Sequence, residues 1–218
     1  MIKLINVSKI YNENIKALEN VSLDFKEGEL IILKGMSGSG KSTILSLIAG
    51  LSKPTKGEVI VDGKKISKLP DHFAASYRRD HIGIVFQKYN LIPTLSVADN
   101  VLLPLFPLNL PRETMQQKAK KVLSVFSIEH KRDLIVKNLS GGEQQRVAIA
   151  RANINDPKII LADEPTANLD EKLSLEFIDI LRELKSKKRT IVVATHDPLF
   201  FDLDFVDRII TIEHGKLR

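Results

Sequence analysis

Short apolar runs alternate with longer helical segments along most of this 218-residue chain. Apolar runs bounded by polar turns predict β-strands, and such runs cover residues 2–10, 17–25, 30–33, 58–61, 81–86, 158–162, 190–194 and 209–213. Helical spacing and helix-start residues predict helices, and these cover residues 44–50, 70–79, 96–103, 111–126, 142–155 and 171–186. Strands that alternate with helices predict an α/β fold with a mostly parallel sheet and helices on both faces.

The middle of the chain departs from this alternation. Between residues 88 and 157 almost no strand signal is present, and helices and loops follow one another. The length of 218 residues fits one compact domain. We therefore expect a single domain whose core is formed by residues 1–87 and 158–218, with residues 88–157 as an inserted helical subdomain.

The composition is that of an ordinary water-soluble protein, with 43% apolar and 28% charged residues. The absence of cysteine excludes disulfides and thiolate metal sites. The N-terminus shows no signal-peptide pattern, which predicts a cytoplasmic chain. The most apolar stretch, residues 101–110, is interrupted by Pro104 and Pro107 and is too short to span a bilayer. We expect no transmembrane segment, so that any role at a membrane requires a partner protein.

The net charge of +6 is compatible with binding to nucleic acid, with an anionic membrane surface, or simply with a basic surface. The densest basic run contains Lys185, Lys187, Lys188 and Arg189 and falls at the predicted end of a helix. Cations are stabilised there by the helix dipole, which favours a structural role. No aromatic residues are interleaved with these charges to stack on bases. Nucleic acid is therefore not an expected partner.

A glycine-rich segment joins the strand predicted over 30–33 to the helix over 44–50. It fills every fixed position of the phosphate-loop pattern G-x-x-x-x-G-K-[ST] in the required context, which an ordinary glycine-rich turn does not explain. Its glycines let the backbone fold around a triphosphate, and the amides of the helix N-terminus point at the anion. Lys41 supplies a positive charge for the β- and γ-phosphates, and the Ser42 hydroxyl is a suitable ligand for Mg²⁺. The residues expected to bind nucleotide are Gly35, Ser37, Gly38, Ser39, Gly40, Lys41, Ser42 and Thr43.

Two adjacent carboxylates end the apolar strand predicted over 158–162. Ligands of parallel sheets bind at this edge. We therefore expect Asp163 to hold Mg²⁺, directly or through water, and Glu164 to polarise the water that attacks the γ-phosphate. Taken alone, the pair is also compatible with two solvated acids after a core strand. The phosphate loop favours the catalytic interpretation.

A second potential anion site lies in residues 139–146 (LSGGEQQR), at the start of the helix predicted over 142–155. Two glycines and a serine at a helix N-terminus form a concavity for anions. Because one nucleotide has only one γ-phosphate, the two anion sites must come from different places. The segment matches, residue for residue, the signature motif of the ATP-binding cassette (ABC) family. The resemblance extends from Tyr11 to the strand after His196.

The resemblance implies roles for further residues. Tyr11 resembles the aromatic residue that stacks on adenine, and Gln87 the glutamine that senses both Mg²⁺ and the attacking water. His196 resembles the switch histidine that reaches the γ-phosphate. Residues 167–170 resemble the loop that crosses the dimer interface, although the family more often has Ser at the position of Ala167. The other histidines lack metal-ligand spacing and are interpreted as structural or solvated: His72, His81, His130 and His214.

The resemblance also implies a fold and a mechanism. The family's fold is a P-loop NTPase core with a mostly parallel sheet, an N-terminal antiparallel β part and an inserted α-helical subdomain. Two cassettes bind head to tail with ATP and Mg²⁺ between them. In such a homodimer Ser140, Gly141 and Gly142 of one copy would contact the γ-phosphate of ATP bound by the other. Hydrolysis of ATP then separates the two copies.

The family's cassettes work with an integral membrane permease subunit at the cytoplasmic face of the cell membrane. Here the permease would rest in a groove near residues 87–104. Residues 86–97, 100–105 and 161–170 resemble the branch of macrolide-efflux, lipoprotein-releasing and cell-division cassettes, many of which transmit force across the membrane. We expect an ATPase subunit of an export or mechanotransmission complex. The alternative is a nucleotide-switched regulator of cell-division or cell-wall machinery, and a cassette acting on ribosomes or DNA is disfavoured.

Overall fold

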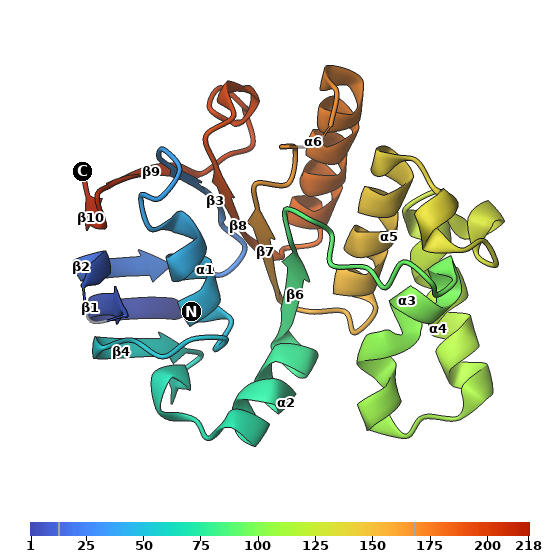
Figure 1. Ribbon diagram of the computed structural model, residues 1–218, viewed down its shortest axis with the longest axis horizontal. Coiled ribbons are helices and arrows are strands. Elements are labelled where there is room, and N and C mark those ends of the chain that lie inside the picture. Colours follow the sequence, from blue (N-terminus) through green and yellow to red (C-terminus); the bar gives the residue numbers. More distant parts are fainter. Residues whose placement is uncertain (13, 168) are drawn as a thin grey trace.

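The computed structural model describes residues 1–12, 14–167 and 169–218, which form two sheets with helices packed around them (Figure 1). The larger sheet has the strand order β10-β9-β3-β8-β7-β6. Strands β6, β7, β8, β3 and β9 are paired in parallel, and β10 is antiparallel to β9. The strands are β3 (Leu30–Lys34), β6 (Ile82–Val85), β7 (Ile159–Asp163), β8 (Thr190–Thr195), β9 (Arg208–Glu213) and β10 (Lys216–Leu217). The predicted α/β fold with a mostly parallel sheet is confirmed.

The smaller sheet is antiparallel and has the strand order β2-β1-β4-β5. The register of β1 against both neighbours shifts between Leu4 and Ser8, so β1 is bulged there. A Cβ atom on Gly57 would lie 2.4 Å from the Ile5 carbonyl oxygen. The close approach of β4 to the bulge therefore requires glycine. The strands are β1 (Ile2–Tyr11), β2 (Ile15–Phe25), β4 (Lys56–Val61) and β5 (Lys64–Lys65).

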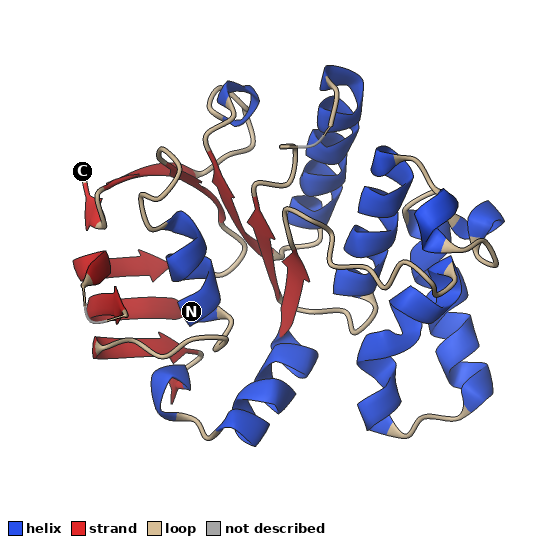
Figure 2. Ribbon diagram, viewed as in Figure 1, coloured by secondary structure: helices blue, strands red, loops and turns tan. Residues whose placement is uncertain are grey.

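Helices cover the larger sheet and fill the segment between β6 and β7 (Figure 2). The α-helices are α1 (Lys41–Ile48), α2 (Asp71–His81), α3 (Val97–Leu102), α4 (Arg112–Val125), α5 (Gly141–Asn153) and α6 (Glu171–Ser186). Short 3-10 helices are η1 (Ile66–Lys68), η2 (Leu103–Leu108), η3 (Glu129–Lys131), η4 (Val136–Asn138) and η5 (Pro198–Phe200). Within residues 86–158, all of which the structure describes, the β-structure amounts to one isolated bridge between Ser96 and Ile135.

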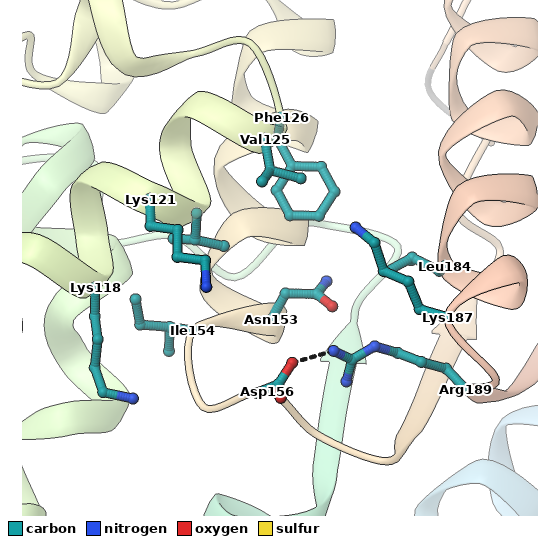
Figure 3. Close-up of a pocket in the computed structure, with 11 residues that line it drawn as sticks. Lys118, Lys121, Val125, Phe126, Asn153, Ile154, Asp156, Leu184, Lys187 and Arg189 are labelled. Atoms are coloured by element: carbon teal, nitrogen blue, oxygen red, sulfur yellow. Dashed lines mark hydrogen bonds and ion pairs between the residues drawn. The ribbon is translucent and has the colours of Figure 1, made fainter.

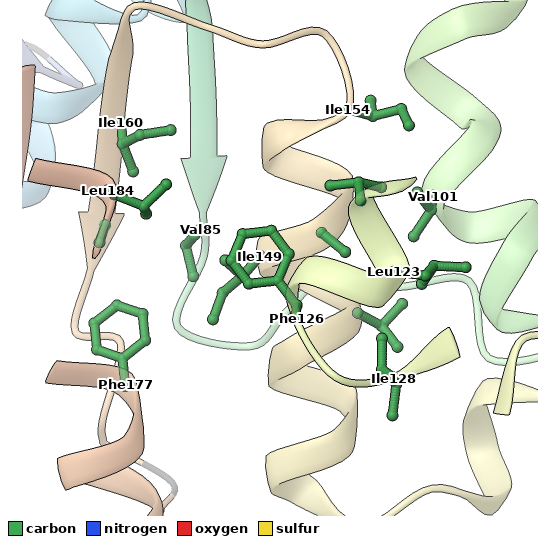
Figure 4. Close-up of a cluster of buried hydrophobic side chains, with 14 of the residues drawn as sticks. Val85, Val101, Leu123, Phe126, Ile128, Ile149, Ile154, Ile160, Phe177 and Leu184 are labelled. Atoms are coloured by element: carbon green, nitrogen blue, oxygen red, sulfur yellow. The ribbon is translucent and has the colours of Figure 1, made fainter. Parts of the chain in front are cut away.

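The larger sheet divides the hydrophobic core into two halves. Alternate side chains of β3 enter opposite halves, with Leu30 and Ile32 on one side and Ile31 and Leu33 on the other. The first half contains residues of α3, α4, α5 and α6, and Figure 4 shows part of it. The second contains α1 and the inner face of the smaller sheet. Since both faces of the central strands β3, β7 and β8 are buried, these strands consist mostly of apolar residues, whereas β9 is partly exposed and half polar.

The observed elements differ from the predicted ones mainly at their ends. Helix α6 has the predicted bounds because the Asp170 side chain accepts a hydrogen bond from the Leu173 amide and fixes the start. The helix predicted over 96–103 ends at Leu102, where Pro104 and Pro107 convert the chain to the 3-10 helix η2. The two-residue strands β5 and β10 were missed, because two residues are too few to carry a periodic pattern.

Candidate functional site

The candidate site lies where three parallel strands end. The segment 35–40 follows β3, Asp163 ends β7, and His196 follows β8 directly. Since β3, β8 and β7 are neighbours in this order, these three segments meet at the carboxyl edge of the sheet. In open α/β sheets ligands bind at this edge. The sequence-predicted residues of the phosphate loop and of the acidic pair are therefore brought together.

The loop between β3 and α1 is tightly held by its glycines. Gly40 has φ +110°, and a Cβ atom there would lie 2.6 Å from the Ala17 carbonyl oxygen. A Cβ atom on Gly35 would lie 2.3 Å from the Ile212 carbonyl oxygen. The loop is thus pressed against β2 on one side and β9 on the other, and its opposite side is open, since Ser37 and Gly38 are exposed. An anion can reach the backbone of this loop and the N-terminus of α1 from solvent.

Lys41 occupies the space inside the loop. Its ammonium group donates to the carbonyl oxygens of Gly35 at 2.7 Å and of Met36 at 3.2 Å. It also pairs with the Glu164 carboxylate at 3.2 Å, with side-chain exposures of 5% for Lys41 and 13% for Glu164. Glu164 Oε1 lies 3.0 Å from His196 Nδ1. In this state Glu164 is therefore the anion that Lys41 neutralises, and the carboxylate links Lys41 to His196.

The backbone at Glu164 is in the left-handed region, with φ +43°. A hydrogen bond of 2.8 Å from the Glu164 amide to the Ala194 carbonyl oxygen, at the end of β8, holds it there. Such a conformation costs about 1–3 kcal/mol for a residue other than glycine and is frequent at functional sites. The turn directs the Glu164 carboxylate to Lys41 and His196 instead of along the strand.

Ser42 and Asp163 form a pair of hard oxygen ligands. The Ser42 hydroxyl donates to Asp163 Oδ1 at 2.8 Å. The pKa of the Asp163 carboxyl is raised above its usual value, mainly by burial and also by the nearby Glu164 charge. The hydrogen bond from Ser42 and the charge of Lys41 act in the opposite direction but do not cancel this effect. Hydroxyl and carboxylate oxygens are the donor types that Mg²⁺ prefers, and Mg²⁺ keeps several other ligands from water or phosphate. Within the described residues no group of three or more His, Cys, Asp or Glu side chains is arranged to hold a metal.

Ser39 and Thr43 complete the predicted loop. Ser39 is buried, and its hydroxyl oxygen has no hydrogen-bond partner among the residues that the structure describes. Its backbone is held on both sides, with the amide bonded to Met36 and the carbonyl to Gly215. Thr43 is half-buried in the first turn of α1. Ser39 thus anchors the loop to the C-terminal hairpin of β9 and β10.

The signature segment lies apart from this site within the chain. Ser140 is the N-cap of α5, where its hydroxyl accepts from the Glu143 amide and the Glu143 carboxylate accepts from the Ser140 amide. Strands β6 and β7 stand between α1 and the start of α5 (Figure 1). A Cβ atom on Gly142 would lie 2.6 Å from Leu173, so Gly142 lets α5 approach α6 closely, while Gly141 starts the helix. Ser140, Gly141 and Gly142 are therefore not part of the pocket formed by their own phosphate loop.

Three further predicted residues lie at or just beyond the ends of strands. Tyr11 ends β1, is 37% exposed, and has the Lys9 ammonium 4.8 Å above its ring. Gln87 is exposed and follows β6 by two residues. Ala167 donates its amide to the Glu164 carbonyl at 3.2 Å. Of the loop predicted to cross a dimer interface, Asn168 lies outside the described residues.

Two buried polar residues were missed by the sequence reasoning. Gln145, on α5, is 3% exposed and donates from Nε2 to the Pro165 carbonyl at 2.6 Å. Thr166 is 5% exposed and donates to Asp197 Oδ2 at 2.8 Å. These bonds join the segment after Glu164 to the signature helix and to the segment after His196. The one signal in the sequence was that both residues neighbour motif positions.

Comparisons with known proteins identify relatives along the whole chain. Residues 18–167 match the family model described as ABC transporter. An ABC transporter ATP-binding protein of Thermotoga maritima is 41% identical, and MJ0796 of Methanocaldococcus jannaschii, also named as an ABC transporter ATP-binding protein, is 44% identical. Both matches cover 100% of this chain, and they cover 93% of the Thermotoga protein and 95% of MJ0796. The macrolide export ATP-binding/permease protein MacB of Salmonella typhimurium is 39% identical over 100% of this chain, which spans 34% of MacB.

Solved structures show the same similarity in three dimensions. The dimeric post-hydrolysis structure of MJ0796 bound to ADP and Pi has a TM-score of 0.92 and 43% identity, covering 100% of this chain and 97% of that one. The structure of cbiO1 from Clostridium perfringens has a TM-score of 0.86 and 30% identity, and the match covers 100% of this chain and 86% of cbiO1. The fold agrees with these matches. The chain therefore belongs to the ABC transporter family, as an ATP-binding cassette with ATPase activity.

Proposed function

We propose that two copies of this chain bind Mg-ATP between them, hydrolyse it, and use the resulting opening and closing to drive a membrane permease. The observation that carries this proposal is the separation of the two anion-binding helix N-termini. The phosphate loop lies at the start of α1, and Ser140 caps α5 beyond strands β6 and β7. A second copy, placed head to tail, can bring its own Ser140, Gly141 and Gly142 to the γ-phosphate.

Within one copy, the phosphate loop binds the nucleotide. The exposed backbone at Ser37 and Gly38 and the N-terminus of α1 supply amides for the phosphates. Lys41, freed from Glu164, pairs with the β- and γ-phosphates. Tyr11, at the end of β1, provides a ring face for adenine. The other loop residues, Gly35, Ser39, Gly40 and Thr43, fix the shape of the cradle.

The metal site consists of Ser42, Asp163 and Gln87. Ser42 and Asp163 already lie within hydrogen-bond distance of each other, at 2.8 Å. Gln87 extends the donor set from the end of β6, and its amide oxygen is a further hard ligand. The Mg²⁺ ion, when bound, neutralises charge on the β- and γ-phosphate oxygens.

Glu164 acts as the general base. It accepts a proton from the water whose oxygen forms a bond to the γ-phosphorus, while the bond from phosphorus to the bridging oxygen breaks and ADP leaves. His196 Nδ1 is within hydrogen-bond distance of Glu164 Oε1, at 3.0 Å, so it can orient the carboxylate. With a proton on both ring nitrogens, its Nε2 can also donate toward the γ-phosphate. The pair between Lys41 and Glu164 must open in this cycle, because Lys41 is needed at the phosphates and Glu164 Oε1 at the attacking water.

The dimer is supported by the MJ0796 structures, which are dimeric and include a state with ADP and Pi. The permease is supported by the similarity to MacB, whose name combines an ATP-binding and a permease function. Among the described residues no helix is long and apolar enough to cross a membrane. We therefore place the chain on the cytoplasmic face of the cell membrane, held there by an integral membrane subunit of an export or mechanotransmission complex.

A hollow of about 260 Å³ is suited to hold part of the permease. It lies between the residues that precede β7 and the segment from α2 to η2, and Arg78, Phe86, Pro104 and Arg151 line it. Gln87 borders it in sequence, so movement of the permease can reach the metal site through this residue. We propose that residues 88–157 form a helical subdomain and that residues 1–87 and 158–218 form the core, with this hollow between the two parts.

The composite site is tested by mixing two inactive variants. Lys41→Ala removes the phosphate contact of its own loop. Ser140→Asp keeps a good N-cap for α5 but places a negative charge where the γ-phosphate of the other copy would lie. In a mixed dimer, one of the two sites contains both defects and the other contains neither. With equal amounts and random pairing, about half of the dimers are mixed, and each mixed dimer has one intact site out of two. We therefore expect up to about a quarter of the wild-type ATPase rate.

The control for this experiment is Ser124→Asp, which makes the same chemical change at an exposed position of α4 and should leave the ATPase rate of the isolated chain unchanged. If the mixture shows no more activity than the sum of its components at every ratio, the two-copy site is wrong. Size-exclusion chromatography adds a second readout. Glu164→Gln in Mg-ATP should elute as a dimer, and Glu164→Gln with Lys41→Ala should elute as a monomer.

The permease is tested separately by placing a photo-cross-linking residue at Lys88, which is exposed next to Gln87. In native membranes we expect the cross-link to join the chain to an integral membrane protein. Cross-links to division or cell-wall proteins alone would instead select the regulator of that machinery. Cross-links to ribosomal proteins alone would contradict both.

A further inference from the structure

A hollow far from the phosphate loop has no role in the proposed ATPase cycle. Its volume is about 460 Å³, which falls in the range of small-molecule sites. It lies between α4, the end of α5 and the end of α6 (Figure 3). Two cations of the basic run at the end of α6, Lys187 and Arg189, belong to its lining.

Helix α4 presents one continuous face to this hollow. Lys118, Lys121, Val122 and Val125 are spaced i, i+3, i+4 and i+7, so they form one stripe along the helix. The stripe begins with two cations and ends with two apolar side chains. Val125 is 43% exposed, so it adds accessible apolar surface to the hollow.

The floor of the hollow is apolar. Phe126, Ile154 and Leu184 line it, and each is at most 5% exposed. These side chains also belong to the first half of the core. A ligand in the hollow therefore meets the outer surface of the packed core, where burial of an apolar body releases water.

The charges around the floor are unequal. The lining contains four cations, Lys118, Lys121, Lys187 and Arg189, and one anion, Asp156. Arg189 bonds Asp156 and the Pro157 carbonyl, so Asp156 is already neutralised. Lys187 pairs with Glu183, which lies on α6 outside the lining. Within residues 1–12, 14–167 and 169–218, Lys118 and Lys121 have neither an ion pair nor a side-chain hydrogen bond.

Two buried polar atoms at the hollow also lack partners among the described residues. They are Arg189 Nε, a donor, and Asn153 Oδ1, an acceptor. Figure 3 shows the Lys121 and Lys187 side chains on either side of Asn153. A ligand oxygen can accept from Arg189 Nε, and a lysine drawn inward by the ligand can donate to Asn153. Unpaired buried polar atoms are costly, so a ligand that satisfies them is favoured.

We propose that this hollow binds an amphiphilic anion, that is, an acyl chain or similar apolar body with one carboxylate or phosphate. The apolar body covers Val122, Val125 and the floor, and the anionic group lies between Lys118, Lys121 and Arg189. A cation is disfavoured by the surplus of positive charge, and an inorganic anion leaves the apolar floor exposed. This site does not depend on the phosphate loop, and its failure would leave the proposed ATPase cycle untouched.

The first test is calorimetric titration of the nucleotide-free chain with dodecanoate below its micelle concentration. We expect saturable binding of one dodecanoate per chain. Lys118→Ala with Lys121→Ala should weaken it at least about tenfold, because two favourable charge interactions are lost. Val125→Asp, at an exposed position, should weaken it similarly by placing a negative charge at the apolar end. Lys64→Ala, an exposed lysine on β5, is the control and should bind like the wild type.

Two further probes test the ligand class. Dodecyltrimethylammonium, with the same chain and the opposite charge, and inorganic phosphate, with no chain, should both fail to bind. Flotation with phosphatidylglycerol vesicles distinguishes a membrane lipid from a free acid as the source of the anion. Equal dodecanoate binding by the wild type and the lysine variant, or equal binding of the cationic analogue, would overturn the proposal. Failure to bind both dodecanoate and the vesicles would overturn it as well.

Discussion

The ion pair between Lys41 and Glu164 leads to a prediction about the empty protein, separate from catalysis. Both side chains are largely buried, and the Lys41 ammonium lies 3.2 Å from Glu164 Oε1. Glu164→Gln removes the negative charge and leaves Lys41 with the carbonyl oxygens of Gly35 and Met36. The variant should therefore be less stable than the wild type when no nucleotide is present.

The size of the effect follows from what remains around Lys41. Removing one partner of a buried ion pair costs about 3–5 kcal/mol. Gln keeps an oxygen that accepts from Lys41, and two carbonyl acceptors persist, so we expect a smaller loss of about 1–2 kcal/mol. For a domain of this size the melting temperature should fall by about 2–8 °C. Mg-ATP should then stabilise the variant more than the wild type, because phosphate replaces the missing anion.

The assay is thermal unfolding of nucleotide-free protein in EDTA, repeated with Mg-ATP. Glu27→Gln makes the same chemical change at an exposed side chain and serves as the control. A Glu164→Gln variant that melts at or above the wild-type temperature without nucleotide would show that the pair does not stabilise the empty protein. The assignment of Glu164 as neutralising partner of Lys41 would then be wrong.

Three further predictions concern the same site. Asp163→Asn should be more stable than the wild type at pH 7 without metal and should lose Mg²⁺-dependent hydrolysis. The pKa of Asp163 is raised above 3.8 in the folded state, so the folded state keeps this proton to higher pH than the unfolded state does. The wild type therefore loses stability as pH rises above 3.8. Urea titrations at several pH values should show that the stability advantage of the variant vanishes as pH falls toward 3.8. Gly40→Ala should lower the free energy of unfolding by more than about 1 kcal/mol and weaken ATP binding. Gly63 has φ +77° and no atom within 4 Å of an added Cβ, so Gly63→Ala should lower the free energy of unfolding less and leave ATP binding intact. Equal decreases in the free energy of unfolding would contradict the contact of Gly40 with Ala17. Lys41→Ala should weaken binding of a fluorescent ATP analogue, and unchanged affinity would remove Lys41 from the phosphate site.

Much of the fold followed from local patterns in the sequence. The strands around the site are apolar except at their ends, so β3, β7 and β8 were predicted within a residue or two. The phosphate loop was equally clear, because each glycine meets a steric demand that the structure shows, as at Gly35 and Gly40. Such demands act over a few residues and leave a direct trace in the sequence.

Contacts between distant segments left no such trace. The pairing of Lys41 with Glu164 joins residues that are far apart in the chain, and each has a separate role in the family pattern. Gln145 and Thr166 read as ordinary polar residues until the fold buries them. The hollow between α4 and α6 depends on how two helices pack, and the spacing of Lys118, Lys121, Val122 and Val125 gained meaning only once the neighbouring elements were known.

The hydrogen bond from Gln145 to the Pro165 carbonyl has a mechanical consequence. Helix α5 carries Ser140 at its tip, and Pro165 directly follows Glu164. If α5 tilts, either the turn that carries Glu164 moves with it, or this hydrogen bond breaks at a buried position where water has little access to replace it. In the proposed dimer, a tilt of α5 that withdraws Ser140 from the other copy's phosphate would therefore also pull on the segment next to Glu164.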